Sequence, residues 1–176
     1  ILAAAREEGA DTEKILLIDR HVEFCANCRE CTQRRRAGRG VCALTDEMGV
    51  ILDRIDASDA LVLASPMNFW TVTAIMKRFM ERLVCYAYWP WGGLSPRMRN
   101  RLKEKRAVVV ASSAAPAIMA RMVTGMVKLL KQTADTLGAR TVGVLFIGMA
   151  ARQPHQELGE KIVKKARKLG KKLASP

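Results

Sequence analysis

Residues 60–83, ALVLASPMNFWTVTAIMKRFMERL, decide the fold because their hydrophobic pattern changes partway along. The first six, ALVLAS, form a continuous apolar run, which predicts a strand buried on both faces. Pro66 is expected to end this strand. From residue 72 to residue 86 the apolar side chains recur at helical spacing. A buried strand that leads into a helix is the repeating unit of a parallel sheet covered by helices.

The rest of the chain repeats this alternation. Further apolar runs predict strands at residues 14–19 (KILLID), 106–113 (RAVVVASS) and 141–148 (TVGVLFIG). Helices are expected at residues 1–8, 46–59 with Thr45 as its cap, 117–138 as one long helix ended by Gly138, and 154–173 with Leu158 facing inward. We therefore expect an α/β fold with a doubly wound parallel sheet and right-handed connections.

The opening segment resembles the second half of an amphipathic helix, which Gly9 closes. Since a strand–helix–strand unit needs about 30 residues, a strand and a loop of roughly 20 residues are expected before residue 1. The expected sheet then has five strands, and its first strand lies outside this sequence. The length of 176 residues suits one domain, residues 1–176.

The chain carries a formal charge of +13, from 30 basic and 17 acidic residues. Two runs hold much of it, residues 34–39 and residues 161–172. Such a charge attracts anions, but neither run contains the aromatic side chains that stack on nucleobases, so nucleic acid is not the expected partner. No apolar run is long enough to cross a bilayer, which argues against a membrane protein.

Four of the five cysteines lie in residues 25–42, CANCRECTQRRRAGRGVC. Thiolates three residues apart converge on one centre in ferredoxin-type loops, whereas zinc more often takes two separate pairs. The neighbouring arginines would offset the negative charge of an iron–sulfur cluster. Three states of these cysteines remain open: ligands of an iron–sulfur cluster, ligands of a zinc ion, and reduced free thiols. The odd, uneven cysteine content favours a cytoplasmic protein over a secreted disulfide domain.

Ligands of open α/β sheets bind beyond the carboxyl ends of the strands. Residues 65–74, residues 112–117 and the cysteine segment all follow predicted strands. Small residues and backbone amides in the first two admit a flat ligand, and Phe69 and Trp70 add rings. The alternative is that both are ordinary turns, with the rings covering the core.

The stretch CANCRECTQ…GVCALTDEMGVILDRIDASDALVLASPMNFWTVTAIMKRFMERL resembles the flavodoxin-like NADPH-dependent FMN reductases, in particular their iron–sulfur flavoprotein branch. The resemblance implies parallel strands in the order 2-1-3-4-5, FMN as cofactor, NADPH or NADH as a possible co-substrate, and a 4Fe–4S cluster. It places the cluster on four cysteines: Cys25, Cys28, Cys31 and Cys42. The spacing from Cys31 to Cys42 is longer than in relatives.

The resemblance also implies which residues contact FMN: Ser65, Pro66, Met67, Asn68, Phe69 and Trp70 on one side, and Ser112, Ser113 and Ala114 on the other. Stacking on the flavin is left open between Phe69 and Trp70. The family's phosphate-binding loop lies between its first strand and first helix and is absent from this sequence. No catalytic acid or base is expected, because the flavin performs the redox chemistry.

These expectations together favour an FMN-dependent oxidoreductase that passes electrons between NAD(P)H, or an acidic carrier such as ferredoxin, and a small-molecule acceptor. It is expected to form a homo-oligomer. Two alternatives remain: a quinone-reductase-like flavoprotein without a metal, and a zinc-stabilised basic binding module. YWPWGG, residues 88–93, is expected to edge a pocket, to form a subunit contact or simply to cover the core. Cys85 is expected in the core, and both histidines on the surface.

Overall fold

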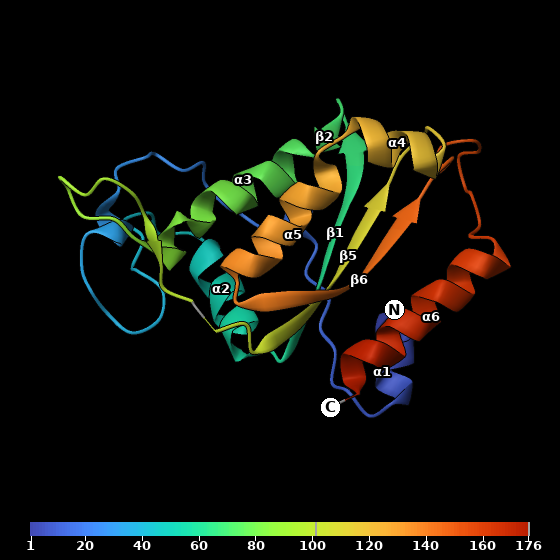
Figure 1. Cartoon of the computed structure of the whole chain (residues 1–176), viewed down its shortest axis with the longest axis horizontal. Coiled ribbons are helices and arrows are strands. Elements are labelled where there is room, and N and C mark those ends of the chain that lie inside the picture. Colours follow the sequence, from blue (N-terminus) through green and yellow to red (C-terminus); the bar gives the residue numbers. More distant parts are fainter. Residues whose placement is uncertain (101, 176) are drawn as a thin grey trace.

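The computed structural model describes residues 1–100 and 102–175. Its main sheet has the order β2-β1-β5-β6 (Figure 1). The three long strands are parallel, and β2 pairs antiparallel with the end of β1. Their bounds are β1 Ala60–Asn68, β2 Thr71–Val72, β5 Lys105–Ser112 and β6 Ala139–Ile147.

The three long strands confirm three of the predicted strands, with bounds that differ by up to three residues. The prediction that Pro66 ends the first of these strands is wrong. β1 continues past Pro66 to Asn68, and the chain then turns into β2. A proline lacks an N–H group, so it is tolerated where a strand needs no donor on one side. On the side away from β5, β1 pairs only through Met67 and Asn68, so Pro66 costs no ladder bond there.

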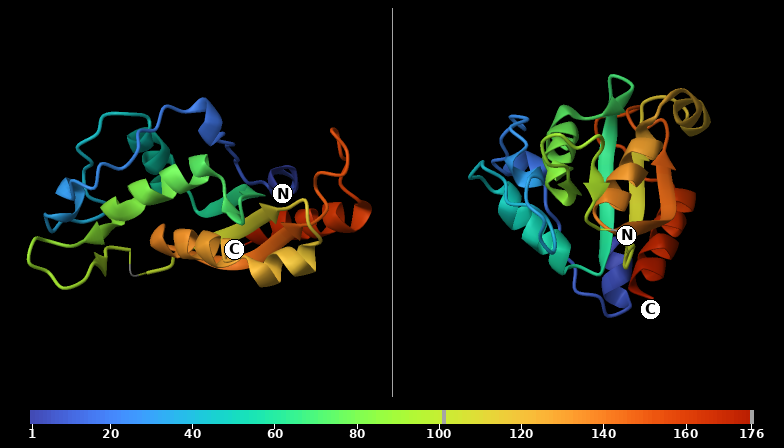
Figure 2. Two further views of the ribbon diagram at one scale, coloured as in Figure 1. Left: turned by 90° about the horizontal axis from the view of Figure 1, so that it is seen from above. Right: turned by 60° about the vertical axis from the view of Figure 1, so that its left-hand side comes forward.

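Helices cover both faces of the sheet (Figures 1 and 2), as a doubly wound fold requires. One face carries α2 Met48–Ala57, α3 Ala74–Arg82 and α5 Met126–Thr136, and the other carries α1 Leu2–Glu7 and α6 Glu160–Ala174. The first face holds the larger core, with Met48, Phe79 and Leu130 among its buried side chains. The second is smaller and centres on Leu169 and Leu173 of α6.

The predicted strand at residues 14–19 is wrong. Leu17–Asp19 form a short 3-10 turn, and Ile18 is 70% exposed. A strand needs a hydrogen-bonded neighbour, and none of the described strands lies beside this segment. Only Ile15 and Leu17 still pack against the core.

The predicted long helix is also corrected, because it breaks into α4 Ala117–Val123 and α5. Thr124 has an extended backbone with φ −120° and ψ 142°, and Gly125 precedes the first turn of α5. Glycine and a β-branched threonine are both weak helix formers, so the break falls where propensity is lowest. The last residue of α5 is Thr136, and Gly138, whose φ is +74°, follows its C-cap as the predicted stop.

Two helix starts differ from prediction. α2 begins at Met48, and the carboxylate of Asp46, rather than Thr45, accepts the Met48 N–H at 3.0 Å. α6 begins at Glu160, so Leu158 lies outside it and is 48% exposed. α3 is shorter than the predicted 72–86: it runs from Ala74 to Arg82, and Thr73 is its side-chain cap, which accepts the Met76 N–H at 3.3 Å.

The region beyond α3 consists of short elements. Leu83–Tyr86 form a 3-10 turn, and β3 Ala87–Tyr88 pairs with β4 Arg97–Met98 to make a small hairpin. Another 3-10 turn, Glu30–Thr32, belongs to the cysteine segment. None of the helices in residues 1–100 and 102–175 is long and apolar enough to cross a membrane.

Candidate functional site

The loops that follow β1 and β5 lie side by side at one edge of the sheet. Ser65 is in register with Ala111 and Pro66 with Ser112, so the two strands reach that edge together. The structure therefore brings residues 65–70 and 112–114 into one neighbourhood, at the carboxyl ends of parallel strands. This is the position in which open α/β sheets bind ligands.

Two serines of this neighbourhood are committed to internal hydrogen bonds. The Ser65 hydroxyl donates to the Pro66 carbonyl at 2.9 Å and accepts the Thr73 N–H at 3.2 Å. The buried Ser113 hydroxyl donates to the Ala115 carbonyl at 2.8 Å. Both side chains shape their turns, and these internal bonds use the hydroxyl protons of both serines.

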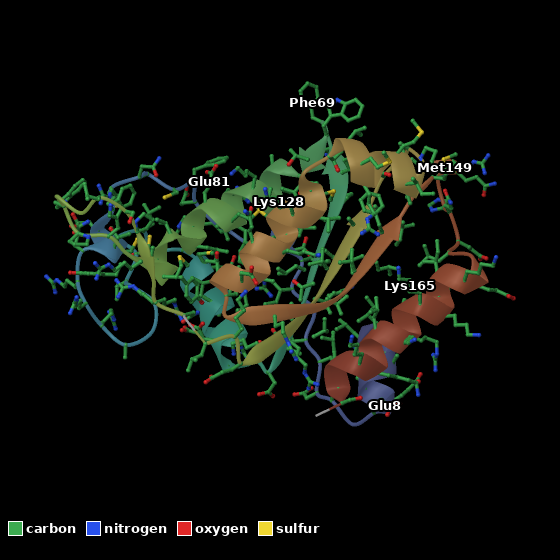
Figure 3. The ribbon with its side chains drawn as sticks, in the orientation of Figure 1. Glu8, Phe69, Glu81, Lys128, Met149 and Lys165 are labelled. Atoms are coloured by element: carbon green, nitrogen blue, oxygen red, sulfur yellow. The ribbon has the colours of Figure 1, made fainter. Side chains whose placement is uncertain are left out.

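Phe69 and Trp70 form the tip of the turn between β1 and β2. Their φ angles are 46° and 67°, and their exposed fractions are 96% and 64%. In Figure 3 Phe69 projects from the tip, away from the body of the protein. A left-handed backbone costs roughly 1–2 kcal/mol for a residue other than glycine, and such strain gathers at functional sites. The expectation that the rings cover the core is wrong, because both are exposed.

Backbone donors are free at the same edge. Between described residues, no hydrogen bond uses the amide of Phe69, Trp70 or Ala114. The remaining expected residues, Pro66, Met67, Asn68 and Ser112, are exposed or half-buried. Free amides and exposed rings suit the carbonyl oxygens and the flat face of a flavin, so these residues fit FMN.

The cysteine segment lies elsewhere, and this corrects the expectation that it follows a strand end. It packs at the end of α3, where the Gly40 N–H donates to the Cys85 carbonyl at 2.7 Å. The strand-end loops meet the beginning of α3, at Thr73. Nine helical residues separate these two places, which corresponds to about 13 Å along the helix axis.

The four clustered sulfurs share one neighbourhood. Burial, together with the neighbouring sulfurs of Cys42, Cys25 and Cys28, raises the pKa of the Cys31 thiol to about 11. Cys28 is exposed, Cys25 and Cys42 are half-buried, and all are free thiols. Four thiols in one neighbourhood are a donor set that fits a cluster or a zinc ion in its chemistry.

The four cysteines are suitable metal ligands by their chemistry, but their side chains are not arranged as a complete metal site. Among residues 1–100 and 102–175, no group of three or more His, Cys, Asp or Glu side chains is placed to hold a metal ion. Cys85 lies in the core as predicted, and burial raises the pKa of its thiol to about 12. His21 and His155 are exposed, also as predicted.

Residues 88–93 cover the cysteine segment. The Arg29 guanidinium lies over the rings of Trp89 and Trp91, at 3.8 Å and 4.3 Å from their centroids. It also donates to the Trp89 carbonyl at 2.7 Å. Thr32 donates to the same carbonyl at 3.0 Å. The aromatic loop therefore packs on Arg29 and Thr32 of the cysteine segment.

Arginines fasten the cysteine segment to the helices. Arg39 forms ion pairs with Asp53 and Asp56 of α2. Arg82, at the end of α3, reaches the Cys42 sulfur. The sequence analysis missed these roles, and Arg82 offered one signal: it is a charged residue among the apolar positions of α3.

Residues 1–173 match the model of a protein family described by its flavodoxin-like fold. The chain belongs to this family. The flavodoxin-like fold predicted from the sequence is thereby confirmed.

Curated relatives of this flavodoxin-like chain are iron–sulfur flavoproteins. One from Archaeoglobus fulgidus is 30% identical over 89 residues, 51% of this chain and 38% of its own length. One from Methanocaldococcus jannaschii is 35% identical over 81 residues, 46% of this chain and 39% of its own. The chain thus spans about two fifths of the length of these relatives.

Solved structures agree on the fold. An FMN-dependent NADH-azoreductase from Bacillus anthracis, in complex with FMN, has a TM-score of 0.70 at 16% identity, over 99% of this chain and 88% of its own. An NAD(P)H:quinone oxidoreductase from Methanothermobacter marburgensis has a TM-score of 0.67 at 19% identity, over 98% and 84%. At these identities the likeness concerns the fold alone.

Proposed function

We propose that this chain is the flavin-binding part of an FMN-dependent oxidoreductase. The observation that carries the proposal is the register of β1 and β5, which sets two ligand-type loops beside each other at the sheet edge. An exposed aromatic tip and free amides on these loops add the chemistry that a flavin needs. The family assignment and the named relatives agree with this proposal.

Each loop has a role in this proposal. The ring of Phe69 or Trp70 stacks on the flavin, and the amide of Ala114 donates to it from the other side. Ser65 and Ser113 hold the two turns in shape through their internal bonds. When bound, FMN supplies the transfer of a hydride or of single electrons.

A 4Fe–4S cluster on Cys25, Cys28, Cys31 and Cys42 is the second part of the proposal. The shared neighbourhood of the four sulfurs supports it, as do the printed names of the curated relatives. Reduced thiols of this kind suit the cytoplasm. Because the segment lies about 13 Å along α3 from the strand-end loops, the cluster would relay electrons over a distance rather than touch the flavin.

The electron donor is proposed to be NAD(P)H or an acidic carrier of the ferredoxin type. Seven of the 15 residues of α6 are lysine or arginine. Such a surface accelerates association with an acidic protein and loses this effect in salt. A rate of reduction that falls with ionic strength would support the carrier, and a rate independent of salt would favour the nucleotide.

A second copy of the chain is the proposed partner of α4. This helix exposes Ile118 by 77%, Met122 by 80% and Val123 by 63%. Monomeric proteins seldom expose several large apolar side chains together. Light scattering after size exclusion should give a dimer or a larger oligomer, whereas a monomer at micromolar concentration contradicts this part.

The decisive experiment is anaerobic purification followed by assays for flavin, iron and sulfide. We expect one FMN per chain and reduction of the flavin by NADPH, NADH or reduced ferredoxin. Bound FMN without iron would support the metal-free flavoprotein. Stoichiometric zinc without flavin would support the zinc-stabilised binding module. Uptake of neither FMN nor iron on reconstitution would refute the oxidoreductase.

A further inference from the structure

Arg82 carries a buried positive charge at the end of α3. Its side chain is 2% exposed, and its ion-pair partner Asp46 is 1% exposed. The two guanidinium nitrogens donate to the two carboxylate oxygens of Asp46 at 2.5 Å and 3.1 Å. Charges this deep are rarely retained for stability, because an apolar pair of the same size serves as well or better.

The same guanidinium joins the two ends of the cysteine segment. Its Nη1 donates to the Glu23 carbonyl at 2.8 Å, two residues before the first cysteine. Its Nη2 lies 3.4 Å from the sulfur of Cys42, the last of the four. Asp46 in turn accepts the Glu23 N–H at 2.7 Å. One ion pair therefore fixes where the segment starts and where it ends.

We propose that Arg82 is a positioning residue that orients the Cys42 sulfur for metal binding and keeps a positive charge beside the bound metal. This inference rests on the proposed metal site. An N–H group that donates to a ligating sulfur withdraws electron density from it, and such hydrogen bonds tune the reduction potential of iron–sulfur centres. Arg82 is well placed for this, because Asp46 and Glu23 also accept hydrogen bonds from its Nη atoms and hold them in position.

Arg99 provides a matched comparison on the same segment. It is also an arginine that fastens the cysteine segment, and it donates to the carbonyls of Cys31 and Arg34 at 3.3 Å and 2.8 Å. No hydrogen bond between described residues joins Arg99 to a sulfur atom. A change at Arg99 therefore reports what loosening of the segment does by itself.

The first test compares Arg82→Lys with Arg99→Lys by titration of the apo chain with Co²⁺, observed through the thiolate-to-cobalt charge-transfer band. Lysine keeps the charge but lacks the planar fork that reaches Asp46, Glu23 and Cys42 together. We expect Arg82→Lys to weaken cobalt binding by about 10- to 100-fold, as for other partners of metal ligands. Arg99→Lys should weaken it much less.

The second test measures the midpoint potential after reconstitution with iron and sulfide. Arg82→Lys should move the potential to more negative values, whereas Arg99→Lys should leave it unchanged. Loosening of the segment alone does not produce this difference. If Arg82→Lys does not fold, the double variant Asp46→Asn with Arg82→Met removes both charges together and should show the same negative shift.

The outcomes separate the two proposals. If the unaltered chain binds neither cobalt nor an iron–sulfur cluster, the metal site itself fails and the role of Arg82 fails with it. If the unaltered chain binds metal and the two lysine variants change affinity and potential equally, the metal site stands and the role of Arg82 is refuted.

Discussion

The two ends of α3 hold their loops in different ways. At its last residue, Arg82 and Asp46 form a buried ion pair that ties the cysteine segment to the helix. At its first turn, the Ser65 and Thr73 side chains accept neutral hydrogen bonds of 3.2 Å and 3.3 Å. The turn between β1 and β2 carries two exposed aromatic residues with left-handed backbones. At the last residue of α3 a buried ion pair holds the cysteine segment. Near its first turn, the strained backbone of Phe69 and Trp70 lies at an exposed tip. A positive charge suits a segment of thiols, and an exposed tip suits a flat ligand.

The largest effect is expected from Asp46→Asn. It leaves the buried Arg82 charge without a counterion, and breaking such a pair by removing one partner costs about 3–5 kcal/mol of unfolding free energy. Chemical denaturation at pH 7 measures it. A loss below about 1 kcal/mol, the range of surface pairs, would mean that the pair does not hold the segment.

The loss of stability caused by Asp46→Asn should depend on pH. Burial raises the pKa of Asp46, but hydrogen bonds from Arg82 and from the backbone outweigh this and lower it below its ordinary value. A lowered folded-state pKa gives stability that is present above about pH 4, the unfolded value, and lost as the pH falls through the folded value. The difference between the unaltered chain and Asp46→Asn should therefore shrink below about pH 4. A difference that stays constant down to pH 2 would contradict this.

Gly40→Ala should have the next largest effect at the cysteine end. A Cβ at this position would lie 1.8 Å from the Cys31 carbonyl oxygen, so the backbone of the segment must move. Overpacking of this kind costs about 1–3 kcal/mol. Gly49→Ala is the control, because a Cβ there meets nothing within 4 Å on α2, and it should stabilise by about 0.5–1 kcal/mol. Equal effects in thermal unfolding would refute the close contact.

At the other end, Phe69→Asn with Trp70→Gly should raise the stability by about 1–2 kcal/mol, because asparagine and glycine accept the left-handed backbone. The same variant should lose FMN binding, which quenching of flavin fluorescence measures. A stable variant that still binds FMN would show that Phe69 and Trp70 are not part of the flavin site.

The smallest effect is expected from Thr73→Ala. It removes the side-chain cap of α3, which is worth about 1 kcal/mol. Denaturation should show this loss with no change in metal content. A loss as large as that of Asp46→Asn would erase the difference between the two ends.

Much of the fold was readable because the three long strands appear as apolar runs. Of these, β5 is buried on both faces, whereas β1 alternates between buried and more exposed residues and β6 is mostly half-buried. KILLID has the same pattern but forms no strand, since pairing depends on a neighbour that a local pattern does not reveal. The break at Thr124 and Gly125 was missed because apolar periodicity continues across it, although both residues are weak helix formers.

The strand-end loops were located correctly because carboxyl ends of parallel strands meet at one edge. The surroundings of the cysteines were not predictable. Arg82 contacts Asp46, Cys42 and Glu23, which lie 36, 40 and 59 residues away in sequence. Only the tertiary fold makes the arginine at the end of α3 the partner of all three.

The contact between α1 and α6 has a consequence for how the protein is made. Arg167 pairs with Glu7 and Lys171 with Glu8, across 160 and 163 residues. Leu169 and Leu173 of α6 are two of the buried side chains of the second, smaller core. During translation this core therefore closes only after α6 has been synthesised, later than the core on the other face.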